Sequence, residues 1–288
     1  MEEVKIGVIG GSGIYDIEGI TEMRKEKIRT PFGDPSDTIV IGRLGGIPVA
    51  FLPRHGKGHS IMPSELNSRA NIYALKSLGV EQIISISACG SLKEELKPRD
   101  IVIPDQLFDR TRQRPYTFFG EGIVAHIGFA NPYCSELSRI LYQVAKDLGL
   151  SAHLGGTYVC IEGPQFSTKA ESKVFRSLGF SIIGMTNLPE AKLAREAEIC
   201  YATLGLVTDY DVWKEGEEVS VDKVIANMLA NIENVKKLVK AAIPRLERER
   251  KCECASALAY AIQTRKWAIN RRTARKLDLL IGKYLKKE

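Results

Sequence analysis

The sequence predicts an α/β fold with a helical extension at its C-terminal end. Short apolar runs, which are typical of buried strands, alternate with amphipathic segments along most of the chain. Neither a linker-like stretch nor an internal repeat interrupts this alternation. The chain has 288 residues, a length that α/β enzymes reach as a single unit. We therefore expect one domain over residues 1–244, followed by an extension over residues 245–288.

The first half of the chain opens with a buried strand that ends in glycines, over residues 4–9. Gly45-Gly46 separates two further strands and predicts a hairpin. An amphipathic segment that begins Pro63-Ser64-Glu65 and ends before Gly79 predicts a helix. The expected elements are strands at 38–43, 47–52, 82–87 and 101–107 and a helix at 63–78.

In the second half the same patterns predict three strands, four helices before the tail, and two helices in the tail with a break near Asn270. The strands are expected at 157–161, 181–185 and 201–208, and the helices at 135–148, 170–177, 189–198 and 221–243. After Pro244 the tail is expected to form two more helices, which separate near Asn270.

The composition is that of an ordinary globular protein, with 44% hydrophobic and 26% charged residues, and it argues against disorder. No apolar run approaches the roughly 18 residues of a membrane span. The first residues lack the layout of a signal peptide. We expect a cytoplasmic protein without a membrane partner.

The net charge of +6 comes from the extension, which holds 13 Lys and Arg against 5 Asp and Glu. A basic tail is compatible with nucleic-acid binding. Its apolar residues at helical spacing favour a solvated helix face or a contact to a neighbouring subunit instead. We expect no nucleic-acid partner.

The six cysteines do not follow a zinc pattern, because there is no CxxC pair and the four histidines lie elsewhere. We therefore expect no metal site. Cys252 and Cys254 have an unusual spacing, at which a disulfide would close a very short, strained loop.

Two glycine-containing segments carry anion-binding chemistry. Gly10-Gly11-Ser12-Gly13 follows the first strand, where backbone N–H groups and the Ser12 hydroxyl suit an anion, although a plain turn is the alternative. It is neither a dinucleotide fingerprint nor a P-loop. Pro53-Arg54-His55-Gly56-Lys57-Gly58-His59 places a guanidinium fork and two imidazoles after another strand. A basic surface turn is the alternative there.

Two further strand ends have small or adaptable residues. Ser87 and Ala88 precede Cys89-Gly90-Ser91, a sequence that lets main-chain N–H groups approach a ligand closely or lets a helix pack tightly. Met185 and Thr186 end another strand, where a methionine is often simply part of the core.

Three acidic residues also follow strands. Glu162 must be either paired or engaged with hydroxyls such as a ribose diol, and Phe166 beside it offers a flat face. Asp209 and Asp211 are spaced i, i+2, so they point the same way. Such a pair suits proton donation, because like charges raise one pKa; metal binding is the lesser option.

Several motifs, taken in order, resemble the methylthioadenosine phosphorylases of the nucleoside phosphorylase family. They are Gly-Gly-Ser-Gly, Pro-Arg-His-Gly-x-Gly-His, Ser-Ala-Cys-Gly-Ser-Leu, Ile-Glu-Gly-Pro-Gln-Phe-Ser-Thr, Gly-Met-Thr-Asn-x-Pro-Glu and Thr-Asp-Tyr-Asp-x-Trp. The resemblance runs from Val4 to Ile243. It implies the nucleoside phosphorylase fold, with a central mixed sheet flanked by helices.

The resemblance also implies roles for individual residues. Phosphate would be held by Ser12, Arg54, His55, Ser87, Ala88 and Thr186. Met185 and Glu162 would lie at the ribose, Asp209, Asp211 and Phe166 at the base, and His59 at the 5′ group. Ser167 and Val221 would shape substrate choice, and His126 would come from a neighbouring subunit.

The implied reaction is reversible phosphorolysis of methylthioadenosine to adenine and 5-methylthioribose 1-phosphate, with phosphate as co-substrate and no cofactor. Asp209 would donate a proton to N7 of the base, and a carboxyl there implies a preference for 6-aminopurines. A broad purine nucleoside phosphorylase that also accepts adenosine, inosine and guanosine shares these motifs and is the alternative.

The tail resembles that of family members from heat-loving organisms. This resemblance implies disulfides, with Cys252–Cys254 and Cys134–Cys200 as the candidate pairs. It also implies a homotrimer, or a homohexamer built from two trimers.

Overall fold

The computed structural model describes residues 3–11, 13, 16–216, 221–246 and 250–285, and the account below concerns these residues. Its strands are β1 (Ile6–Gly10), β2 (Ile20–Glu26), β3 (Ile39–Leu44), β4 (Ile47–Pro53), β5 (Gln82–Ser91), β6 (Ile101–Ile103), β7 (Gln106–Arg110), β8 (Ala152–Leu154), β9 (Thr157–Ile161), β10 (Ile182–Gly184) and β11 (Cys200–Asp209). Its helices are α1 (Ser68–Ser77), α2 (Ser135–Asp147), α3 (Lys169–Ser177), α4 (Asn187–Glu196), α5 (Val221–Leu246), α6 (Arg271–Lys276) and α7 (Asp278–Leu285), with short 3₁₀ turns η1 (Glu253–Ser256) and η2 (Lys266–Ala268).

The strands in this part of the chain form one mixed sheet around the long strand β5. β5 pairs in parallel with β1 on one side and with β11 on the other. Its last residues also pair antiparallel with β10, so β5 borders both halves of the sheet. The mixed α/β fold predicted from the sequence is confirmed, and so is the hairpin of β3 and β4.

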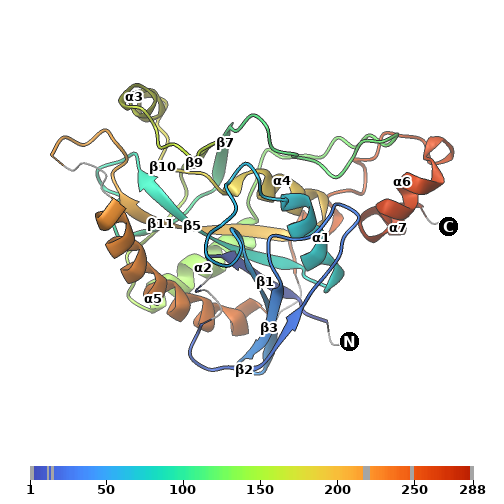
Figure 1. The fold of residues 1–288 in the computed structure, drawn as a ribbon, viewed down its shortest axis with the longest axis horizontal. Coiled ribbons are helices and arrows are strands. Elements are labelled where there is room, and N and C mark those ends of the chain that lie inside the picture. Colours follow the sequence, from blue (N-terminus) through green and yellow to red (C-terminus); the bar gives the residue numbers. More distant parts are fainter. Residues whose placement is uncertain (1–2, 12, 14–15, 217–220, 247–249, 286–288) are drawn as a thin grey trace.

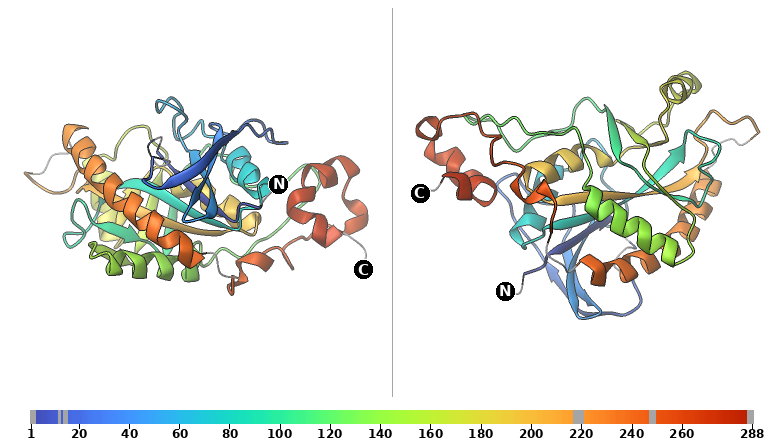
Figure 2. Two further views of the ribbon diagram at one scale, coloured as in Figure 1. Left: turned by 90° about the horizontal axis from the view of Figure 1, so that it is seen from below. Right: turned by 180° about the vertical axis from the view of Figure 1, so that it is seen from behind.

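Helices cover both faces of the sheet (Figures 1 and 2). The side chains of β5 alternate between two apolar cores: Ile83 packs in the core that contains α1 and α4, and Ile84 in the core that contains α2 and α5. This alternation is the period-2 geometry of a strand with both faces buried.

Two element boundaries differ from the prediction because of single residues. The helix expected at 63–78 begins only at Ser68, since the Asn67 side chain caps it by accepting a hydrogen bond from the Ala70 N–H at 3.2 Å. The strand expected at 101–107 is divided into β6 and β7 at Pro104, which has no N–H for the ladder. The polar strand β2 and the short strand β8 were not predicted.

The first of the two expected tail helices is wrong. Residues 250–270 contain only η1 and η2, because their backbone pairs with the loop around residues 124–126. Gln263 N–H donates to Val124 O at 2.9 Å, and His126 N–H donates to Ala261 O at 2.8 Å. After Asn270, which caps α6, the tail does become helical.

The extension lies beside this loop and near α1, where α6 and α7 are drawn in red in Figure 1. Its side chains Leu258, Leu277 and Ile281 are buried in the core that contains α1 and α4. Among the described helices, none is long and apolar enough to cross a membrane.

Candidate active site

Four strands of the sheet deliver the predicted polar residues to one region. Arg54 follows β4, Ser87 and Ala88 lie in the second half of β5, Thr186 follows β10, and Asp209 ends β11. Since β5 runs antiparallel to β10, the residues after β10 come back alongside Ser87. Ligand sites of open α/β sheets form at such strand ends.

Ser87, Thr186 and Tyr158 form a hydroxyl cluster. Ser87 Oγ lies 2.7 Å from Thr186 Oγ1 and 3.0 Å from Tyr158 Oη. Ala88 is exposed although both of its neighbours are buried, so β5 presents an open patch of backbone beside this cluster. The structure therefore brings together Ser87, Ala88 and Thr186, as the sequence predicted, and adds a tyrosine.

Arg54 is fully buried and takes internal partners. Its Nε donates to Glu190 Oε1 at 2.5 Å and its Nη2 to Glu190 Oε2 at 3.2 Å. Further donations go to Ile86 O and Ser85 Oγ, both at 2.8 Å. The guanidinium is thus held largely by internal partners and its charge is compensated by a buried carboxylate, and its contact with phosphate stays a prediction.

His55 is a neutral imidazole in this structure. Burial and, next, the positive charge of Arg54 lower its pKa to about 4. Its Nδ1 lies 2.9 Å from Ile61 O, a contact in which the nitrogen must donate. The neutral ring then has Nε2 as an acceptor, not as the second donor that the sequence suggested. The His59 ring stacks on it with centroids 4.3 Å apart.

Asp209 and Asp211 both lie beside Gly90, although Asp211 is in a turn beyond β11 with a positive φ of 52°, so strand alternation does not account for their proximity. Asp209 accepts hydrogen bonds from Thr208 Oγ1 at 2.6 Å and from the Asp211 N–H at 2.7 Å. Burial raises the pKa of both carboxyls. A Cβ at Gly90 would come within 3.0 Å of Asp209 Oδ1, so the glycine leaves room for this carboxylate.

Three buried oxygens meet at this pair, where the two serine hydroxyls lie close enough to the Asp211 carboxyl to lower its pKa but make no hydrogen bond of regular geometry. They are Asp211 Oδ2, Ser167 Oγ and Ser172 Oγ. Such atoms are costly unless a ligand satisfies them. Ser167 was predicted to shape substrate choice, whereas Ser172 on α3 was not predicted at all.

Glu162 is paired, which is one of the two states that the sequence allowed. Its Oε1 lies 3.2 Å from Arg114 Nε, and its Oε2 accepts a hydrogen bond from the Arg112 N–H at 2.5 Å. Arg114 also donates to Met185 O at 2.7 Å. Both oxygens of Glu162 therefore have a partner within the protein, and a contact between Glu162 and a ribose diol stays a prediction. Through Arg114 the carboxylate positions Met185.

Met185 packs against Gly163, where an added Cβ would come within 2.5 Å of its sulfur. Phe166, on the loop that follows, exposes 60% of its surface and has an open ring face. Neither observation tests a contact with a substrate.

One predicted residue is not brought to this region, and two others cannot be placed in it. His126 is exposed, and its N–H is bonded to the extension. Ser12 and the side chain of Val221 lie outside the described residues.

All six cysteines are free, so the predicted disulfides Cys252–Cys254 and Cys134–Cys200 are not formed in this structure. The reason is geometric: the sulfurs of these four residues gather in one cluster and are not joined in pairs. Cys200 Sγ and Cys252 Sγ, which do not form one of the predicted pairs, lie 3.2 Å apart. This distance is longer than the roughly 2.05 Å of a disulfide.

Sequence reasoning missed Glu190, Arg114, Tyr158 and Ser172. Glu190 stood in the Gly-Met-Thr-Asn-x-Pro-Glu motif, but it was read only as part of a helix. The available signal was the position of Glu190 on the helix face that carries Leu193 and Ala194, since a carboxylate on a buried helix face needs a cation. Arg114 and Tyr158 had no comparable signal.

Comparisons with known proteins place this architecture in a class. The sequence profile of the phosphorylase superfamily matches residues 5–244. A chain from Geobacter sulfurreducens named S-methyl-5′-thioadenosine phosphorylase is 56% identical over 99% of this chain and 100% of its own length.

Solved structures agree. A methylthioadenosine phosphorylase from an antarctic soil metagenomic library has a TM-score of 0.94 and 50% identity, covering 97% of this chain and 99% of that one. A Schistosoma mansoni methylthioadenosine phosphorylase in complex with adenine has a TM-score of 0.84 and 37% identity, covering 90% and 99%. The chain therefore belongs to the phosphorylase superfamily and, within it, to the family of the S-methyl-5′-thioadenosine phosphorylases.

Proposed function

We propose that this protein catalyses the reversible phosphorolysis of S-methyl-5′-thioadenosine to adenine and 5-methylthioribose 1-phosphate. The observation that carries the proposal is the buried Asp209–Asp211 pair next to the open backbone and hydroxyls of Ser87, Ala88 and Thr186. The carboxyl pair suits a heterocycle that must gain a proton, and the open backbone with its neighbouring hydroxyls suits an anion. The names of relatives at 50–56% identity over nearly the full chain support the same substrate.

Phosphate is proposed to lie against the hydroxyls of Ser87 and Thr186 and the backbone of Ala88. Arg54 remains a predicted ligand through the second N–H of its Nη1, because Glu190 holds Nε and Nη2 and Ile86 O takes the other N–H of Nη1. Ser12 remains a predicted ligand from the glycine-rich loop.

His55 contributes through its proton balance. Because its pKa is about 4, the ring is neutral near pH 7 in the free protein. A dianion bound at Nε2 favours a protonated ring, so phosphate binding is expected to raise this pKa. Phosphate can also bind while the ring stays neutral, because a protonated phosphate oxygen then donates a hydrogen bond to Nε2.

The base is proposed to meet Asp209 and Asp211. A carboxyl whose pKa is raised by burial holds its proton closer to neutral pH, and a protonated Asp209 donates it to N7. Thr208 Oγ1 also lies 3.2 Å from Cys89 O, so its hydroxyl has a second acceptor and can turn to accept from a protonated Asp209. The side-chain oxygens of Ser167, Ser172 and Asp211, which lack hydrogen bonds of regular geometry, are candidates for the exocyclic amino group.

The reaction follows from these two halves. A phosphate oxygen attacks C1′ while the bond to N9 breaks, and the electrons of that bond go to the base as N7 gains its proton. The sugar passes through an oxocarbenium-like state, which the negative charge of the phosphate stabilises. Phosphate is the co-substrate, and no step requires a cofactor.

The 5′ side is proposed to be shared between subunits. His126 is exposed and fastened by its N–H to the extension, so in an oligomer it is available to a neighbouring site. A homotrimer or homohexamer is the assembly we propose. Met185, Phe166, His59 and Val221 keep their predicted roles at ribose, base and 5′ group.

The decisive experiment compares kcat/KM on methylthioadenosine with and without phosphate, and then on adenosine and inosine. We expect cleavage only with phosphate and a strong preference for methylthioadenosine over inosine. Cleavage in the absence of phosphate identifies a hydrolase, and equal rates on inosine identify a broad purine nucleoside phosphorylase. Either result refutes the proposal.

A further inference from the structure

Four of the six cysteines meet at one point, away from the candidate active site. The sulfurs of Cys134, Cys200, Cys252 and Cys254 all lie within 4.8 Å of one another. Cys134 immediately precedes α2, Cys200 is the first residue of β11, and the other two belong to the turn around η1 in the extension. Three of the four are buried, and Cys252 is half-buried. Segments that are far apart in the sequence thus converge through their thiols.

We propose that these four cysteines are a tetrathiolate metal site that binds one zinc ion per chain. Zinc binds thiolates at about 2.3 Å in a tetrahedron, which places the sulfurs about 3.8 Å apart. The observed separations lie around that value, from 3.2 Å between Cys200 and Cys252 to at most 4.8 Å. Small rotations of the side chains are enough to reach the ideal geometry.

The arrangement fits one ion better than pairs of sulfurs. Two disulfides require each sulfur to be close to a single partner. A tetrahedral ion requires each sulfur to be close to all three others, and that is what the cluster shows. An iron–sulfur cluster needs wider spacing, because its cysteines bind different iron atoms. Four thiolates in a tetrahedron favour zinc among the common divalent ions.

Positive groups surround the sulfurs. A zinc ion with four thiolates carries two negative charges, which a buried site must balance. Arg195 Nη1 donates to Cys254 Sγ at 3.7 Å, and Arg250 Nη1 donates to Cys200 Sγ at 3.9 Å. Cys134 occupies the N-cap position of α2, where the helix dipole favours a thiolate. These groups form an outer shell suited to thiolates.

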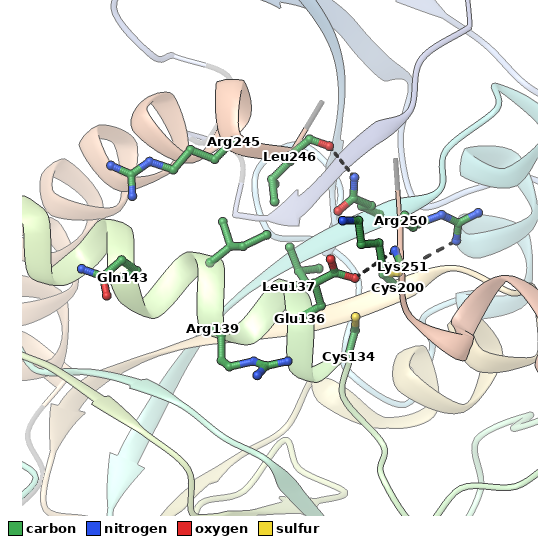
Figure 3. Close-up of a pocket in the computed structure, with 12 residues that line it drawn as sticks. Cys134, Glu136, Leu137, Arg139, Gln143, Cys200, Arg245, Leu246, Arg250 and Lys251 are labelled. Atoms are coloured by element: carbon green, nitrogen blue, oxygen red, sulfur yellow. Dashed lines mark hydrogen bonds between the residues drawn. The ribbon is translucent and has the colours of Figure 1, made fainter. Parts of the chain in front are cut away.

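Solvent reaches the cluster through a cavity of about 570 Å³. Cys134 and Cys200 belong to its wall, together with Glu136, Arg250 and Lys251 (Figure 3). A route from solvent to the ligands is a requirement for loading a metal into a folded chain. The cavity supplies this route.

The ion would fasten the extension to the sheet. Two ligands belong to the core of the fold and two to the extension, so the metal would add to the link that hydrogen bonds, the Arg250–Glu81 ion pair and apolar packing already make. Its role is structural, because all four ligand positions are taken by protein.

The test measures metal content directly. The full chain, produced with zinc in the medium and purified under a thiol reductant without chelator, is expected to contain about one zinc per chain. In the double variant C252S/C254S and in the single variant Cys134→Ser, the zinc content per chain should fall at least about tenfold. Cys160→Ala removes a buried thiol outside the cluster and should keep it.

Cobalt provides a readout on the unaltered chain, so the test survives a variant that fails to fold. Replacing zinc with Co²⁺ should give the intense visible bands of a tetrahedral site and sulfur-to-metal charge transfer in the near ultraviolet. The proposal is overturned if reduced protein takes up neither ion stoichiometrically. It is also overturned if protein made without reductant lacks metal and its intact mass is lower by four hydrogens, the signature of two disulfides.

Discussion

Two buried charged groups beside β5 are built in opposite ways. The Arg54–Glu190 pair is satisfied within the protein, with the carboxylate bound to Nε and Nη2 of the guanidinium and also accepting from Tyr201 Oη at 3.0 Å. The Asp209–Asp211 pair has no cation among the contacts described, and Asp211 Oδ2 faces the Ser167 and Ser172 hydroxyls without a hydrogen bond of regular geometry. The first pair is a fixed electrostatic element that is complete before any ligand arrives. The second is incomplete, and a ligand is needed to satisfy it.

This difference indicates that the Arg54–Glu190 pair acts on the stability of the fold and the Asp209–Asp211 pair on catalysis. Changing the satisfied pair should damage the fold, whereas changing the unsatisfied pair should damage chemistry and leave stability nearly intact. The predictions below separate these two effects.

Removing one partner of the satisfied pair has the largest expected effect. Glu190→Ala leaves the Arg54 charge buried without its carboxylate and should lower the free energy of unfolding by about 3–5 kcal/mol. Urea unfolding measures the change. Glu26→Ala, which breaks the exposed pair with Arg24, is the control and should cost less than about 1 kcal/mol. If both variants are equally stable, Arg54 does not depend on Glu190.

Asp209→Asn tests the unsatisfied pair. It removes the proposed proton donor, so kcat/KM on methylthioadenosine should fall by roughly a hundredfold or more. The preference for methylthioadenosine over inosine, given by the ratio of the two kcat/KM values, should fall with it. Unfolding in urea should change little, because the amide replaces a carboxyl whose ionisation burial already opposes. Asp147→Asn, at a surface pair with Arg245, is the control. Unchanged preference for methylthioadenosine would show that Asp209 does not choose the base.

Glu196 is intermediate between the satisfied and the unsatisfied pair. It accepts hydrogen bonds from Thr117 Oγ1 and the Phe118 N–H, but it has no ion-pair partner among the contacts described. Burial raises its pKa from 4.5 to about 7. In the folded state Glu196 therefore keeps its proton to a higher pH than in the unfolded state. Its contribution to the free energy of unfolding is fully present below pH 4.5 and is lost as the pH rises through 7.

The corresponding prediction concerns the pH dependence of unfolding. Over this window Glu196 should reduce stability by about 3 kcal/mol, and Glu196→Gln should remove that part of the slope. Urea titrations at pH 5 and pH 8 measure it. An unchanged slope in the variant would assign the pH dependence to other groups.

Tyr158→Phe has the smallest expected effect. It removes one hydroxyl from the Ser87–Thr186 cluster, a loss of about 1 kcal/mol, and should raise the KM for phosphate about fivefold. The KM for methylthioadenosine should stay nearly constant, which separates a local effect on the phosphate side from a general loss of packing. A rise in both values would contradict the local role.

Sequence reasoning reached the fold and most of the site because both depend on local patterns. Short apolar runs ended by glycine located most of the sheet, and the polar residues after those runs include Ser87, Thr186 and Asp209. It failed where the partner lies far away in the chain. Nothing in the sequence near Arg54 shows that Glu190, 136 residues later, holds its guanidinium.

The cysteines show the same limit. A zinc pattern is recognised from closely spaced ligand pairs, and Cys134 and Cys200 each come from separate elements with no neighbouring ligand. Only the packing of the extension against the start of β11 brings the four sulfurs together.

The extension also has a consequence for any attempt to shorten the chain. The profile match ends at residue 244, which makes that position an obvious place to truncate. Yet Leu258, Leu277 and Ile281 share a core with α1, and the backbone beyond 260 pairs with the loop that carries His126. A truncated protein would expose that apolar surface and release the loop, so the minimal folding unit extends well past the boundary that the family profile suggests.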